Sequence, residues 1–123
     1  MDFMIDIEPA GDGVVVVRVA GEIDTATELR LRDALLAAVG QRGATHVVVD
    51  LAEVVFIDST GVGALMAARN AAARAGRSLS VRNANGIVGQ VLATVLAHPE
   101  VLEPPWAARP PASQTAGEPD SRT

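Results

Sequence analysis

The segment Asp58-Ser59-Thr60-Gly61 places one carboxylate and two hydroxyls where an apolar strand pattern changes to a helical one. The first turn of a helix leaves backbone N–H groups without partners and carries about half a positive charge. A serine there can cap the helix, and it can also hold a phosphate. A plain Asp or Ser N-cap is the simpler interpretation. Ser59 as a phosphoacceptor is the other, with Thr60 as a second candidate acceptor.

Two short motifs change that balance. Gly21-Glu22-Ile23-Asp24 lies some thirty-five residues before the D-S-T-G motif of the run VVVDL…VFIDSTGVGAL, and together they resemble the STAS family, specifically the bacterial anti-sigma-factor antagonists. The resemblance covers residues 3 to about 97. It implies that the serine after the aspartate of the D-S-[ST]-G motif, here Ser59, is phosphorylated by a partner kinase. It also implies that Asp24 lies near this serine and helps partner binding or phosphotransfer. The expected partner-binding residues are Asp24, Asp58, Ser59, Thr60 and Gly61.

The resemblance implies a regulator that is not an enzyme. Unphosphorylated, it would bind an anti-sigma factor that is also a serine kinase, and so free the sigma factor. The kinase, with ATP and Mg²⁺, would phosphorylate Ser59 and end the binding, and a phosphatase would restore it. Two other functions stay open. The same domain serves as a cytoplasmic subunit of lipid or anion transporters, and the strand ends are also a place for a small-molecule ligand.

Several enzyme classes do not fit the residues. A nucleophile elbow, G-x-S-x-G, needs glycine at the position of Ile57. His46 begins the strand whose far end leads to Ser59, so it is too distant to be a base. The chain has no lysine, which excludes a P-loop, and no cysteine. Neither His46 nor His98 has carboxylates at metal-ligand spacing, and no cofactor or metal is expected.

Composition indicates one domain with an aliphatic core. The 123 residues are 49% hydrophobic but only 2% aromatic. The net charge of −5 argues against nucleic acid and anionic membranes as partners. No signal peptide or run of membrane-spanning length is present, so the expected location is the cytoplasm, without insertion into a membrane.

Hydrophobic periodicity predicts the order β-β-α-β-α-β-α, an α/β layer fold of the STAS type. Its sheet would be mixed and mostly parallel, of about four strands with helices packed on it. Asp24 or a Thr25–Glu28 capping box would open the first helix. The strand beginning at His46 would loosen over 50–54 and return to the interior at 55–57. The other expected elements are strands at 3–8, 14–19 and about 78–82, and helices from Ser59 to Gly76 and from Ile87 to about 97.

The last twenty residues differ in composition. Six of the seven prolines lie at or beyond Pro99, and the end of the chain shows no apolar period. We therefore expect a STAS-like domain at 1–103 and a disordered, Pro-rich tail at 104–123. The family usually adds a further strand and a closing helix, which this sequence does not show. Val101, Leu102 and Trp106 are candidates to pack in their place, to form an exposed patch or to contact a partner.

Overall fold

The computed structural model describes residues 2–97, and the predicted element order is confirmed within them. His98, the predicted domain boundary at 103/104, the tail and the packing of Val101, Leu102 and Trp106 lie outside the described residues. The elements are β1 (Met4–Gly11), β2 (Val14–Ile23), α1 (Glu28–Val39), β3 (His46–Ile57), α2 (Ser59–Arg74), β4 (Ser78–Arg82) and α3 (Gly86–Ala97).

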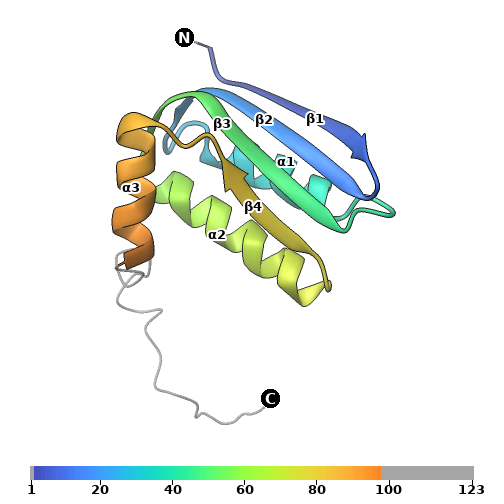
Figure 1. Cartoon of the computed structure of the whole chain (residues 1–123). Coiled ribbons are helices and arrows are strands. Elements are labelled where there is room, and N and C mark those ends of the chain that lie inside the picture. Colours follow the sequence, from blue (N-terminus) through green and yellow to red (C-terminus); the bar gives the residue numbers. More distant parts are fainter. Residues whose placement is uncertain (1, 98–123) are drawn as a thin grey trace, which may run out of the picture.

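The four strands form one mixed sheet in the order β1-β2-β3-β4. β1 and β2 are antiparallel because only Asp12 and Gly13 join them, and both adopt positive φ. β2, β3 and β4 are parallel, since α1 and α2 carry the chain back between them. The carboxyl ends of these three strands therefore meet at one edge of the sheet (Figure 1).

Helices α1 and α2 lie side by side against one face of the sheet (Figure 1). Alternate valines of β2 and β3, among them Val17 and Val49, point into this layer and are fully buried. Leu31 and Leu35 of α1 and Val62 of α2 meet them from the other side. The core is aliphatic, as composition predicts. No helix within residues 2–97 combines the length and the apolar character needed to cross a membrane.

β3 departs from the predicted pattern. It runs unbroken from His46 to Ile57, and its pairing with β2 shifts twice, between Arg18 and Ala20 and between Gly21 and Glu22 of β2. Each shift places an extra residue in β3, as in a β-bulge, and resets the alternation of side chains. The prediction that 55–57 all return to the interior is therefore wrong: Val55 is 50% exposed and Phe56 40%, and only Ile57 is buried.

The predicted capping box at Thr25 is also wrong. α1 begins at Glu28, and Thr27 occupies the N-cap position without a side-chain cap hydrogen bond. The preceding turn is held by Asp24, whose Oδ1 accepts hydrogen bonds from the backbone N–H groups of Ala26, at 3.0 Å, and Thr27, at 3.2 Å. An aspartate can satisfy a turn as well as a helix end, and short sequence patterns do not distinguish the two.

Candidate functional site

The rim of the sheet, defined here as Asp24, Asp58, Ser59 and Thr60, lies where β2 and β3 end. Ile23 pairs with Ile57 as the last residues of the two strands. The Asp58 backbone N–H donates to the Ile23 carbonyl at 3.1 Å, and this bond fixes the start of α2 beside the end of β2. Asp24 and Asp58, each following its strand, thus leave neighbouring strands at the same edge, as the parallel order predicts.

Asp58 is the N-cap of α2. Its backbone is extended, and its Oδ1 accepts from the Gly61 N–H at 3.1 Å. The Thr60 hydroxyl donates to the same oxygen at 2.6 Å. Of the two candidate N-cap residues, Asp58 and Ser59, the aspartate therefore caps the helix. The Thr60 hydroxyl supports this cap.

Ser59 is left free by this arrangement. It is the first residue of α2, its side chain is exposed, and among residues 2–97 no hydrogen bond to its Oγ is found. Its hydroxyl stands at the positive end of a sixteen-residue helix that has no acidic residue in its first turn. Such a position stabilises added negative charge.

Asp24 has a structural role that leaves part of it available. Besides the two backbone N–H groups, its Oδ1 accepts from the Thr27 hydroxyl at 3.3 Å. The single proton of this hydroxyl is shared with the Glu22 carbonyl, which is the nearer acceptor at 2.8 Å. All of the carboxylate's hydrogen bonds within residues 2–97 go to Oδ1, and the side chain is half-buried. The turn is therefore held through Oδ1 alone, and Oδ2 has no hydrogen bond within these residues.

Gly61 lies beneath the rim, not on its surface. It is buried, and a Cβ at this position would lie 2.4 Å from Ile23 Cγ2 and 2.8 Å from Ile57 Cγ1. Glycine is therefore required for α2 to approach the last residues of β2 and β3 this closely. A direct contact between Gly61 and a partner remains a prediction.

Two apolar side chains beside the rim were not predicted as part of the site. Val55 and Phe56, separated from Asp58 by the buried Ile57, are exposed because of the register shifts in β3. Exposed aromatic and branched side chains next to a polar rim are typical of protein interfaces. The sequence shows an apolar run here, but only the β2–β3 register shows which of its members face solvent.

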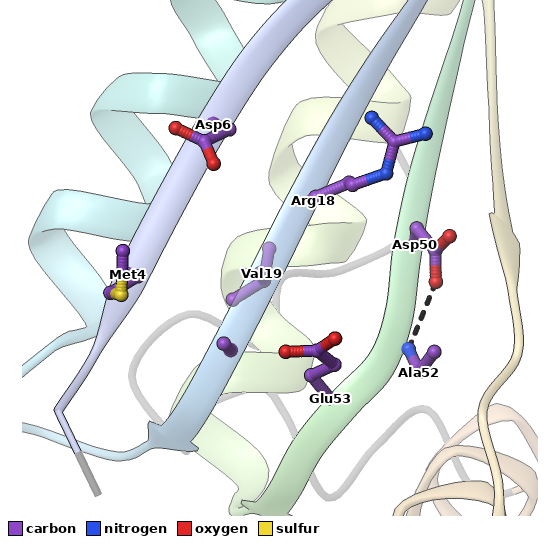
Figure 2. A pocket seen from close by; sticks show the side chains of 8 residues that line it. Met4, Asp6, Arg18, Val19, Asp50, Ala52 and Glu53 are labelled. Atoms are coloured by element: carbon purple, nitrogen blue, oxygen red, sulfur yellow. Dashed lines mark hydrogen bonds between the residues drawn. The ribbon is translucent and has the colours of Figure 1, made fainter.

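A second polar region occupies the face of the sheet that α1 and α2 leave uncovered. The register places Asp6, Arg18, Asp50 and Arg82 in one row across the four strands, and we call this row the open face. Figure 2 shows Asp6, Arg18 and Asp50 here, with Glu53, around a hollow of about 240 Å³. Its charges alternate in sign, and Arg18 also forms an ion pair with Glu8.

Asp50 is the most constrained carboxylate of the open face. Its Oδ1 accepts from the Ala52 N–H at 2.9 Å, drawn in Figure 2, and from Asn83 Nδ2 at 3.2 Å, while Arg82 Nε donates to Oδ2 at 3.0 Å. The Ala52 N–H lowers the pKa of Asp50 most, and the Asn83 and Arg82 hydrogen bonds and the Arg82 charge lower it further. Partial burial opposes them. These carboxylate bonds tie β3 to β4, which is a structural task.

His46 is remote from the rim, as the sequence predicts. It starts β3, and its ring nitrogens contact the hydroxyls of Ser78, through Nδ1, and Ser80, through Nε2 at 2.9 Å. A twelve-residue strand of roughly 35 Å separates it from Ser59. The rim therefore lacks the His46 base that a serine hydrolase of this kind would need.

Comparison with known proteins agrees with this geometry. A family model described as "Mlab, STAS domain" matches residues 8–98. An anti-sigma F factor antagonist of Paenibacillus polymyxa is 30% identical over 80 residues, which are 65% of this chain and 68% of that protein.

Solved structures of anti-sigma factor antagonists are also similar to this chain. An anti-sigma factor antagonist from Mycobacterium paratuberculosis is 27% identical, with a TM-score of 0.64 over 81% of this chain and 82% of its own. The antagonist SpoIIAA has the same fold in its unphosphorylated and phosphorylated forms. Both are 21% identical with TM-scores of 0.60, covering 73% and 78% of this chain and 82% and 86% of theirs.

The fold and topology expected from the motifs are present. The matched region spans the second half of β1, the other three strands, the rim and all three helices. The chain belongs to the STAS domain family.

Proposed function

We propose that this protein is an anti-sigma-factor antagonist, a binding protein of the cytoplasm that is not an enzyme. Unphosphorylated, it binds an anti-sigma factor of the serine-kinase type at the rim and frees the sigma factor. Phosphorylation of Ser59 by that kinase, with ATP and Mg²⁺, ends the binding, and a phosphatase restores it. The 30% identical relative carries this function in its name, and SpoIIAA exists in both phosphorylation states.

The observation that carries the proposal is the different state of the two rim hydroxyls. Thr60 donates its proton to Asp58 at 2.6 Å, whereas the Ser59 hydroxyl is exposed and has no partner among residues 2–97. A kinase can approach Ser59 without breaking a hydrogen bond of the folded protein. Modification of Thr60 would cost the support it gives to the cap. Ser59 is therefore the preferred acceptor.

Electrostatics supplies the switch. A phosphoserine adds about −1.5 to −2 charges and three acceptor oxygens. At Ser59 the N-terminal end of α2 stabilises the phosphate. The Asp58 carboxylate beside it adds further negative charge to the rim. A partner that meets the unmodified rim through apolar or acidic groups loses affinity by desolvation and repulsion. A change of about 2.7 kcal/mol lowers affinity a hundredfold, so no backbone rearrangement is required.

The experiment combines mapping of the site with a variant pair. The protein is incubated with its cognate kinase and ATP, and the modified residue is identified by mass spectrometry. Ser59→Ala should prevent incorporation and bind the kinase constitutively, whereas Ser59→Asp should bind at least tenfold more weakly, about 1.4 kcal/mol. Thr60→Ala is the matched control and should still be phosphorylated at Ser59. Equal kinase affinity of Ser59→Ala and Ser59→Asp would contradict the switch.

A second candidate is a STAS-type cytoplasmic subunit of a lipid or anion transporter. The description of the matching family model names the domain without naming a sigma system, which leaves this function compatible with the fold. In that case the rim would contact an ATPase subunit. Copurification with a transporter, together with no incorporation of phosphate at Ser59, would favour it over the first proposal.

A further inference from the structure

An apolar groove of about 300 Å³ lies between α2, β4 and α3, away from the open face. Leu65 and Met66 of α2, Leu79 and Val81 of β4 and Leu92 of α3 form most of its wall, and Arg69 stands among them. Val81 is 36% exposed, although it belongs to a strand. The groove therefore leaves apolar surface in water that a further segment can cover.

Helix α3 also exposes apolar surface outside the groove. It carries no charged residue, and Ile87 on it is 55% exposed. A helix that is apolar on several sides is normally covered on more than one of them. α3 contacts β3 and α2 (Figure 1). It borders the groove through Leu92.

The segment that follows α3 has the composition to fill the groove. Residues 98–106, HPEVLEPPW, contain Val101, Leu102 and Trp106, whereas residues 107–123 contain no valine, leucine, isoleucine, methionine or aromatic residue. Aromatic side chains contribute the most buried area per residue, and Trp106 is the only tryptophan. The large apolar residues of the segment are thus concentrated within nine positions of the end of α3.

Chain geometry allows this segment to return to the groove. Leu92 lies five residues before the end of α3 at Ala97, a distance of roughly 7.5 Å along the helix axis. Nine residues from Ala97 to Trp106 span up to about 30 Å. The sequence of this segment includes Pro99, and proline disfavours a helix interior. A short tether also raises the effective concentration of the segment to the millimolar range, so a weak contact suffices.

The charges are complementary. Helix α2 carries Arg69 and Arg74 and no acidic residue. The segment 98–106 carries Glu100 and Glu103 and no arginine or lysine. The Arg69 guanidinium at the groove can pair with one of these carboxylates or lie over the face of an indole ring.

We propose that residues 98–106 of this chain bind in the groove between α2, β4 and α3, with the Trp106 indole as the apolar anchor and Arg69 as its charged neighbour. The occupant is a part of the same molecule, not a second copy and not another protein. The bound segment then covers the apolar surface that the groove leaves in water.

The fluorescence of Trp106 tests this directly in the full chain, because the sequence has no other tryptophan and no tyrosine. A bound indole should emit at shorter wavelength than in denaturant and be poorly quenched by acrylamide. Arg69→Glu should shift the emission to longer wavelength and raise the quenching constant several-fold. Arg74→Glu makes the same charge change on the same helix away from the groove, and should leave both values unchanged.

A second pair of variants tests the groove without changing any charge. Val81→Gln places a polar side chain in the groove and should expose the indole, whereas Leu29→Gln, at an exposed leucine of α1, should not. Circular dichroism confirms that each variant is folded. Emission of the folded wild type equal to that in denaturant would overturn the proposal. So would equal effects within either pair. An emission shift that depends on protein concentration, with a dimer in light scattering, would assign the groove to a second copy and also overturn it.

Discussion

The rim and the open face contain similar side chains, yet they differ in how those side chains are used. On the open face, Asp50 accepts three hydrogen bonds from Ala52, Asn83 and Arg82, and Arg18 pairs with Glu8. At the rim, the Ser59 hydroxyl has no partner within residues 2–97. Polar groups that already have protein partners hold strands together, and those without partners remain available to another molecule. The presence of charge alone does not mark a functional site.

Among variants at the rim, Gly61→Ala should have the largest effect on stability. In Gly61→Ala the new methyl group meets Ile23 and Ile57 closely, and overpacking of this kind costs about 1–3 kcal/mol. Urea denaturation should show the loss. Gly63→Ala is the matched control, because a Cβ at Gly63 has no neighbour within 4 Å, and it should stabilise the helix by about 0.5–1 kcal/mol. A similar result for both glycines would mean that the strand ends can move apart at little cost.

Asp58 and Ser59 divide the rim into a structural and a free part. Asp58→Ala removes the oxygen that accepts from Gly61 and Thr60, and should reduce the free energy of unfolding by about 0.5–2 kcal/mol. Ser59→Ala should change it far less, since no hydrogen bond is lost. Thermal or urea unfolding of the two variants measures the difference. A cost for Ser59→Ala as large as that for Asp58→Ala would show that the serine has a structural role after all.

Asp50 provides a pH-dependent test of the open face. Its pKa lies below the usual value of 3.8, so the ionised form stabilises the folded state. That contribution is complete above the usual value and is lost as the pH falls through the lowered folded pKa. The stability difference between wild type and Asp50→Asn should therefore be largest near neutral pH and shrink in acid. A difference that stays constant over this range would indicate a loss of packing and not of charge.

The pair between Arg18 and Glu8 should give the smallest effect. Both side chains are about half exposed, 49% and 53%, and exposed ion pairs contribute about 0.2–1 kcal/mol. Glu8→Gln should lower stability by no more than this, and added salt should reduce the effect further. A larger and salt-insensitive loss would mean that the open face is shielded from solvent in the folded protein.

The architecture was predictable because each element carries its own signal. The valines of 14–19 and 47–49 and the spacing of Leu31, Leu35 and Val39 fix the strands and the first helix locally. Parallel strands then bring Asp24 and Asp58 to one edge, since their carboxyl ends must coincide. That part of the site follows from topology alone.

The features that the sequence did not predict depend on contacts between distant segments. The exposure of Val55 and Phe56 arises from the register between β2 and β3, which no pattern within β3 reveals. Neither Asp24 nor Thr25 caps the first helix, because the Asp24 carboxylate binds the backbone of the turn before it. The burial of Gly61 requires the positions of Ile23 and Ile57. Each of these is a tertiary effect.

The two extra residues in β3 have a consequence for the evolution and engineering of this protein. They make β3 longer than β2, so that β3 ends at Ile57 opposite Ile23. As a result, α2 starts beside the end of β2. Deletion of one residue between Asp50 and Phe56 would pull the serine back by one position and turn its neighbours to the opposite side. The accessibility of a single hydroxyl is thus set by chain length in a strand, several residues before the helix that carries it.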